Sequence, residues 1–207
     1  MNSNSKHWDD IFSKTEDEKM GWYEKDTSQT FNLLQKIPDW EKATVFIPGA
    51  GTSILIDELL SKGLKLILND ISSEALNKVK NRLQGQYEKI DWLCHDIAQP
   101  IKESIPKVDI WIDRAVLHFL TKEEDIKGYF DNLKSLLKSG GHAIFAEFSI
   151  TGATKCAGLT VHRYSVDELV QNLGQSFKLV SDFEYTYINP FGVQRPYIYA
   201  LLKREQY

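Results

Sequence analysis

The sequence predicts an α/β fold in which a doubly wound, mostly parallel β-sheet carries helices on both faces. Short apolar runs alternate along the chain with segments whose apolar residues recur at helical spacing, the pattern of strands joined by crossover helices. Two long β-rich runs, 177–187 and 194–203, flank a turn-forming cluster at 189–192 and predict a C-terminal antiparallel hairpin. At 207 residues, the chain fits one domain with a substantial core.

The first half of the chain contains two predicted strand–helix units. A strand over 45–47 leads into a glycine turn, and apolar residues over 54–60 recur at helical spacing up to Gly63. A second strand begins at Lys65. The segment 72–83 then places its apolar residues on one face and its cations near the C-terminal end, which predicts a second crossover helix.

The second half repeats the alternation. Three further strands are expected, over 90–94, 108–113 and 142–148. Residues 121–124 fit a capping box that opens a helix through Leu137, which we expect to stop at Gly140 and Gly141. Residues 165–168 fit a second capping box, opening a helix that ends near Leu173.

The charge, the apolar runs and the cysteines of the sequence argue against a nucleic-acid, membrane or metal partner. The formal net charge is −4 with both signs interspersed, so the basic stripe that nucleic-acid backbones require is not visible, and no nucleic-acid partner is expected. Residues 1–10 lack the apolar block of a secretory signal, and no apolar run reaches membrane-spanning length. Cys94 and Cys156 lie far apart without metal-ligand spacing. We therefore expect a cytoplasmic protein with no membrane association and no metal; the oligomeric state stays open, with a monomer favoured.

A nucleoside pocket is predicted where the first strand ends. Gly49 and Gly51 can adopt backbone angles closed to other residues and let a ligand lie against bare main chain. Asp70 ends the neighbouring strand, where a carboxylate can accept both hydroxyls of a ribose. Ile54 replaces the third glycine of the dinucleotide fingerprint, which favours S-adenosylmethionine over NAD. The alternative is that these glycines merely end a strand, as glycines often do.

Four sequence motifs carry a resemblance to a known family. They are Trp8 together with 21–23, the lead 45–48 into the glycine turn, 111–115, and 154–159. On these motifs the chain, over nearly its whole length, resembles the class I S-adenosylmethionine-dependent methyltransferases. It looks most similar to the thiopurine and thiol methyltransferases and to the trans-aconitate methyltransferase-like proteins.

The resemblance implies one Rossmann-like domain over 1–207 with a seven-stranded sheet, and with 1–40 as an N-terminal helical lid. It implies methyl transfer from S-adenosylmethionine to a small-molecule acceptor, such as a thiol, a carboxylate or a similar nucleophile. The first alternative is a protein lysine methyltransferase on the same scaffold; a reductase-type nucleotide-binding module and a non-enzymatic sensor are further alternatives. Ile47 departs from the family, because many members carry an acidic residue there that contacts the methionine end of the cofactor.

The resemblance also assigns residues to the cofactor. These are Trp22, Gly49, Ala50, Gly51, Asp70, Ile71, Asp96, Ile97 and Arg114. Asp96 would accept a hydrogen bond from the adenine amino group, and Trp22 would lie on a lid. The plainer alternatives are that Asp96 caps the loop to Pro100 and that Trp22 is a core aromatic residue.

Other residues are assigned to catalysis and to the acceptor. The catalytic candidates are Arg114 and His118, and the substrate candidates are Tyr23, His118, Lys155, Arg163 and Tyr164. His118 would act as base for a neutral acceptor, whereas Arg114, Lys155 or Arg163 would hold an anionic one. The alternatives are an ion pair of Arg114 with Asp113 or Asp109, a core histidine at 118, and a solvated lysine beside a buried thiol at 155–156.

Overall fold

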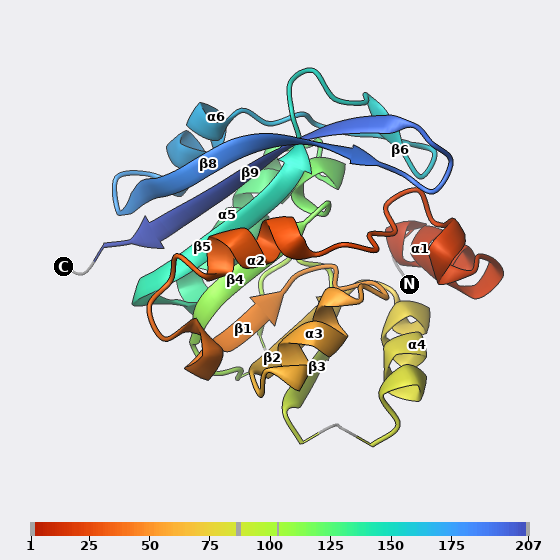
Figure 1. The fold of residues 1–207 in the computed structure, drawn as a ribbon, viewed down its shortest axis with the longest axis horizontal. Coiled ribbons are helices and arrows are strands. Elements are labelled where there is room, and N and C mark those ends of the chain that lie inside the picture. Colours follow the sequence, from red (N-terminus) through yellow and green to blue (C-terminus); the bar gives the residue numbers. More distant parts are fainter. Residues whose placement is uncertain (1–2, 86–87, 103, 206–207) are drawn as a thin grey trace.

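The structure, a computed structural model, describes residues 3–85, 88–102 and 104–205. Its main feature is a seven-stranded sheet with the spatial order β3-β2-β1-β4-β5-β9-β8 (Figure 1). The strands are β1 (Thr44–Ile47), β2 (Lys65–Asp70), β3 (Ile90–Cys94), β4 (Val108–Arg114), β5 (Leu137–Phe148), β8 (Phe177–Ile188) and β9 (Gln194–Arg204). The strands from β3 to β5 are parallel, and β9 pairs antiparallel with both β5 and β8. The predicted fold class, including the C-terminal hairpin, is confirmed.

Helices cover both faces of this sheet. They are α1 (Ser3–Lys14), α2 (Ser28–Leu34), α3 (Leu55–Ser61), α4 (Ser73–Leu83), α5 (Glu123–Leu136) and α6 (Val166–Leu173). Side chains alternate across β1, so Val45 and Ile47 pack with α2, α3 and α4, whereas Phe46 packs with α5 and α6 on the opposite face. Phe46 stacks on the fully buried Trp111 of β4, with 4.4 Å between ring centroids.

The N-terminal segment predicted as a lid divides into two parts. Leu33 and Leu34 of α2 are fully buried in the core. In contrast, α1 lies beside α4, away from the sheet (Figure 1). Within the described ranges, no helix combines the length and the apolar character needed to cross a bilayer.

The start and end of α5 differ from the prediction. The helix begins at Glu123, and its N-cap residue Lys122 makes no side-chain capping bond, so the expected capping box at 121–124 does not form. The chain then enters β5 directly at Leu137, which places Gly140 and Gly141 inside a strand. A β-carbon on Gly141 would lie 2.9 Å from the Asp109 carbonyl oxygen. Gly141 therefore allows close packing inside the strand, Gly140 adopts a φ of +79°, and neither stops the helix.

The Ser165 half of the capping box predicted for α6 forms, whereas the Glu168 carboxylate contacts His162 Nε2 at 2.6 Å. The Ser165 hydroxyl accepts a hydrogen bond from the Glu168 backbone N–H at 3.1 Å, and α6 ends at Leu173 before Gly174. The short strands β6 (Lys155–Cys156) and β7 (Leu159–Thr160) form a separate hairpin after β5.

Candidate active site

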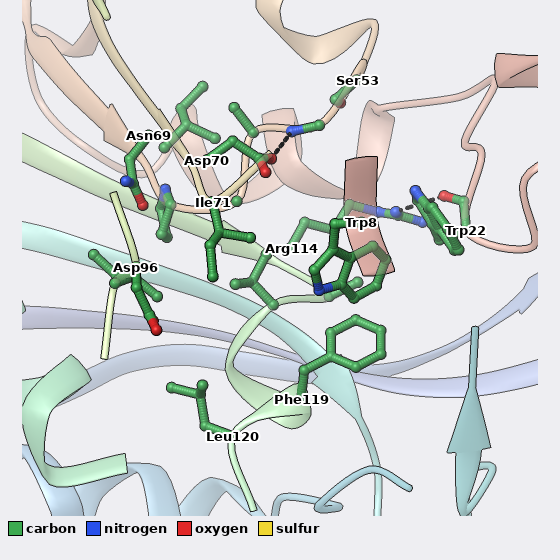
Figure 2. Close-up of a pocket in the computed structure, with 18 of the residues that line it drawn as sticks. Trp8, Trp22, Ser53, Asn69, Asp70, Ile71, Asp96, Arg114, Phe119 and Leu120 are labelled. Carbon is green, nitrogen blue, oxygen red and sulfur yellow. Dashed lines mark hydrogen bonds between the residues drawn. The ribbon is translucent and has the colours of Figure 1, made fainter. Parts of the chain in front are cut away.

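A cavity of about 650 Å³ opens where β1, β2, β3 and β4 end (Figure 2). The loops that follow these strands form its floor, and residues of α1 and of the segment 20–24 complete its walls. In a doubly wound sheet, ligands bind outside the carboxyl ends of the strands at the switch in strand order. Here that switch lies between β1 and β4. The chain adds β2 and β3 on one side of β1, and it then crosses to the other side to add β4 and β5.

The glycine turn after β1 forms one wall of this cavity. Gly49 and Gly51 adopt φ angles of +48° and +52°, which side chains rarely adopt. A β-carbon on Gly49 would lie 2.5 Å from Val116 Cγ2, so the turn packs directly against the loop after β4. The Ala50 N–H donates to the Asn69 carbonyl at 2.8 Å and ties the turn to β2. Only glycine fits the close contact between residue 49 and Val116, so the main chain of the turn carries no side chain at this point.

Asp70 fastens the same turn from the end of β2. Its Oδ2 accepts a hydrogen bond from the Gly51 N–H at 2.8 Å, and its Oδ1 accepts one from the Ser72 N–H at 2.8 Å. Burial raises the pKa of this carboxyl to about 6. An ionised carboxylate offers about four acceptor positions, so both oxygens keep capacity for a ligand's hydroxyl groups.

The far end of the cavity follows β3. Ile71, Asp96 and Ile97 line it, and Leu120 lies across from them (Figure 2). Asp96 Oδ1 also accepts a hydrogen bond from the Ala98 N–H at 3.0 Å. The residue thus makes the loop-capping contact considered as its alternative and lines the cavity as well.

Aromatic rings wall the opposite end. Trp8 of α1 faces Phe119 edge-on, with 4.8 Å between ring centroids, and meets Trp22 at 5.7 Å (Figure 2). Phe12 of α1 packs against Gly51, since a β-carbon there would lie 3.4 Å from its Cζ. α1 is attached to α4 through Asp9, whose Oδ1 accepts from the Ser72 hydroxyl at 2.7 Å. Residues of α1 therefore form part of the cavity wall, and a lid over 1–40 stays a prediction.

Arg114 lines the cavity but is engaged by the N-terminal segment. Its Nε lies 2.7 Å from Glu24 Oε2, and its Nη1 donates to the Trp22 carbonyl at 2.9 Å. The ion pair with Asp113 or Asp109, considered as the alternative to a role in the site, does not form. Burial acts to lower the pKa of Arg114, but the Glu24 carboxylate together with Tyr199 and Tyr197 outweighs burial and holds this pKa above its ordinary value.

His118 lies outside the cavity. It is fully buried, its Nδ1 is 2.6 Å from Glu147 Oε2, and burial lowers its pKa to about 3. Glu147 is equally buried, and burial raises the pKa of its carboxyl to about 8. This is the core-histidine arrangement, and it removes His118 from contact with a ligand.

A buried network behind the cavity holds the loop after β4. Asp113 accepts hydrogen bonds from the N–H groups of Val116 and Leu117 at 3.1 and 3.2 Å. It also accepts from the Tyr129 hydroxyl at 2.5 Å. Burial and the nearby Glu147 carboxyl raise the pKa of Asp113 well above its ordinary value. The network fixes the position of Val116, which packs on the glycine turn.

The predicted site residues therefore fall into two groups. Those that line the cavity are Trp22, Tyr23, Gly49, Ala50, Gly51, Asp70, Ile71, Asp96, Ile97 and Arg114. His118 and Tyr164 are fully buried away from it, and Lys155 and Arg163 are exposed, with Arg163 donating to the Ile150 carbonyl at 2.7 Å. The hairpin that contains Lys155 reaches the cavity through Leu159 and Thr160 instead.

Several residues that line the cavity were not predicted from the sequence. Glu24 stands out, because it is 7% exposed and makes an ion pair, yet a lone glutamate in a polar segment gives no pattern in the sequence. Phe12 and Phe119 were likewise not singled out, although an aromatic residue one turn after Trp8 is a signal for a shared helix face. Within the part of the chain that the structure describes, no group of three or more His, Cys, Asp or Glu side chains is placed to hold a metal ion.

Comparison with known proteins identifies the domain. The family described as "Methyltransferase domain" matches residues 48–143, which contain the glycine turn, Asp70, Asp96 and Arg114. This stretch, just under half of the chain, is similar to methyltransferase domains. The resemblance to class I methyltransferases is thereby confirmed, whereas the likeness to the thiopurine and trans-aconitate groups stays a prediction.

Relatives of this methyltransferase domain include both a curated sequence and solved structures. Malonyl-[acyl-carrier protein] O-methyltransferase 2 of Ilyobacter polytropus is 29% identical over 135 residues, covering 63% of this chain and 44% of that protein. The chain thus spans less than half the length of this relative.

Two of the solved structures that share the fold illustrate the similarity. The N-methyltransferase NodS of Bradyrhizobium japonicum, in complex with S-adenosylhomocysteine, matches with a TM-score of 0.73 at 14% identity, covering 99% of this chain and 100% of that one. The 1,6-didemethyltoxoflavin-N1-methyltransferase of Burkholderia thailandensis matches with a TM-score of 0.69 at 15% identity, covering 99% and 85%.

Proposed function

We propose that this protein transfers a methyl group from S-adenosylmethionine to a small-molecule acceptor. The observation that carries the proposal is the glycine turn after β1, held to Asp70 by the Gly51 N–H at 2.8 Å and open to the cavity. The family match at residues 48–143 and the methyltransferase relatives support it. The cytoplasmic location and the monomeric state remain predictions from the sequence.

The residues of the cavity fit S-adenosylmethionine. Gly51 offers main chain that a side chain would cover, and Asp70 keeps acceptor positions for ribose hydroxyls. Asp96 and Ile97 would hold the adenine end. Arg114 lines the same cavity, and its Nη2 is buried with no hydrogen-bond partner among the described residues. When bound, S-adenosylmethionine supplies a methyl group that its sulfonium already activates.

The protein's own contribution is orientation and exclusion of water. The Val116 loop, fixed by Asp113, and the rings of Trp8 and Trp22 confine the acceptor end. Holding nucleophile and methyl carbon in a near-attack arrangement can supply roughly 7–11 kcal/mol of the barrier. Because His118 does not line the cavity, we drop its role as general base and propose acceptors that attack without one, such as a thiolate, a carboxylate or a free amine.

The aromatic cover supports a small acceptor over a protein lysine. Trp8 contacts both Trp22 and Phe119 across the acceptor end, and a lysine on a folded protein would have to pass between these rings. The test is transfer of radiolabelled methyl from S-adenosylmethionine into fractionated metabolites and proteins, with Asp70→Ala as the control. We expect label in the low-mass fraction only. Label confined to protein would contradict the small-molecule proposal, and no label in any fraction would contradict methyl transfer.

A further inference from the structure

The segment 20–24, called the cap segment below, crosses the acceptor end of the cavity without regular secondary structure over most of its length. Met20, Trp22, Tyr23 and Glu24 of this segment all line the cavity. An irregular segment needs hydrogen bonds from elsewhere to hold its buried polar groups. The residues that supply those bonds therefore control the position of the Trp22 ring.

One ion pair and three hydrogen bonds hold the cap segment, and they come from the end of β4 and from the C-terminal hairpin. Arg114 Nε lies 2.7 Å from Glu24 Oε2, and Nη1 donates to the Trp22 carbonyl at 2.9 Å. The Tyr187 hydroxyl of β8 donates to the Tyr23 carbonyl, and the Tyr199 hydroxyl of β9 donates to Glu24 Oε1 at 3.3 Å. Three successive residues of the cap segment are thus tied to the sheet.

The ion pair between Arg114 and Glu24 is buried and surrounded by aromatic rings. The side chains of Arg114 and Glu24 are 10% and 5% exposed, so solvent screens their attraction little. The guanidinium lies over the rings of Tyr187 and Tyr197, at 5.3 and 5.6 Å from their centroids. The guanidinium thus attracts the Glu24 carboxylate by charge while it donates a hydrogen bond to the Trp22 carbonyl.

We infer that Glu24 and Arg114 form a clamp that positions the cap segment, and with it the Trp22 ring, across the ligand cavity. Arg114 is then a positioning residue that acts through Glu24 and the Trp22 main chain. This inference rests on the proposed function only in its choice of ligand, because its test uses S-adenosylhomocysteine as the probe.

The decisive variant is Glu24→Gln, because two roles of Arg114 predict opposite signs for it. If Arg114 acts through the clamp, loss of the Glu24 charge releases the cap segment, and S-adenosylhomocysteine binds about tenfold more weakly or worse. If Arg114 instead holds the ligand directly through Nη2, the same change frees its charge and leaves binding equal or tighter. Isothermal titration of the wild type, Glu24→Gln, Arg114→Gln and the double variant separates the two.

The clamp also predicts non-additive losses. The double variant should bind no more weakly than the weaker single variant, because each substitution breaks the same connection. Arg114→Lys should recover part of the loss, since it keeps the charge without the fork. The exposed pair Lys127–Asp131 on α5 gives the matched control cycle, and Lys127→Gln with Asp131→Asn should leave binding unchanged. Unchanged or tighter binding by Glu24→Gln, or additive losses, would overturn the clamp.

Two further measurements keep the result interpretable. Near-ultraviolet circular dichroism reports the edge-on contact of Trp8 with Trp22. Loss of this dichroism signal in ligand-free Glu24→Gln would support the clamp. It would do so even if S-adenosylhomocysteine does not bind the wild type, a result that would refute only the proposed function. If Glu24→Gln does not fold, Tyr187→Phe removes only the hydroxyl bound to the Tyr23 carbonyl and should weaken binding in the same direction. Wild-type binding and dichroism in folded Tyr187→Phe would then contradict the inference.

Discussion

Gly49→Ala tests how closely the glycine turn fits the wall opposite. The new β-carbon would lie 2.5 Å from Val116 Cγ2 and 2.9 Å from Val116 Cγ1, so the turn or the Val116 loop has to move. Val116 cannot yield easily, because its N–H is bound to the buried Asp113 carboxylate at 3.1 Å. The substitution should therefore destabilise the fold and distort the cavity together.

The magnitude has two parts. A β-carbon at a φ of +48° costs about 1–2 kcal/mol. Overpacking against Val116 adds about 1–3 kcal/mol, for a total of about 2–5 kcal/mol. Gly192→Ala is the matched control: its φ is +75°, yet nothing lies within 4 Å of the added carbon, so it incurs only the backbone cost. The entropy that alanine removes from the unfolded chain cancels in this comparison.

The assay is urea unfolding of both variants, followed by titration with S-adenosylhomocysteine. We expect Gly49→Ala to lose about 1–3 kcal/mol more of its free energy of unfolding than Gly192→Ala. It should also bind the ligand at least about tenfold more weakly, whereas Gly192→Ala should bind as the wild type does. Equal stability of the two variants would refute the close approach of the turn to Val116, and the reasoning built on it.

Three further predictions concern the buried carboxylates and α1. The folded protein keeps the proton of Glu147 up to about pH 8, whereas the unfolded chain loses it near the ordinary value of 4.5, so this group makes stability fall as pH rises through that window. Glu147→Gln should flatten this decline in urea unfolding measured from pH 5 to 9; an unchanged slope would show that Glu147 does not titrate there. Asp9→Asn should weaken the contacts of α1 with Ser72 and Glu74 by about 1 kcal/mol, seen as faster hydrogen exchange in α1; unchanged protection would refute this anchor. Asp70→Ala should abolish measurable S-adenosylhomocysteine binding, and retained affinity would remove Asp70 from the ribose site.

The sequence predicted the fold well because its signals are local. The limits of β2, β3 and α6 follow from apolar runs, and Ser165 caps α6 as its spacing to Glu168 indicates. The error at α5 has a tertiary cause. Gly140 and Gly141 looked like a helix stop, but the chain enters β5 at Leu137 and uses Gly141 to approach the Asp109 carbonyl.

The candidate site divides in the same way. The glycine turn, Asp70 and Asp96 were found because each follows a predicted strand, and the parallel sheet brings those ends together. His118 could not be placed from the sequence, because its spacing along the chain from Arg114 does not reveal which side of the loop each residue faces. Glu24 could not be predicted either, because this residue of the N-terminal segment meets Arg114 only in the folded chain.

Isothermal titration of the wild-type protein with S-adenosylhomocysteine, and separately with NAD, tests the central claim most directly. The glycine turn with Ile54 in place of a third glycine, together with the Asp70 carboxylate, predicts saturable one-to-one binding of S-adenosylhomocysteine and no binding of NAD at the same concentration. Binding of NAD without binding of S-adenosylhomocysteine would contradict the account.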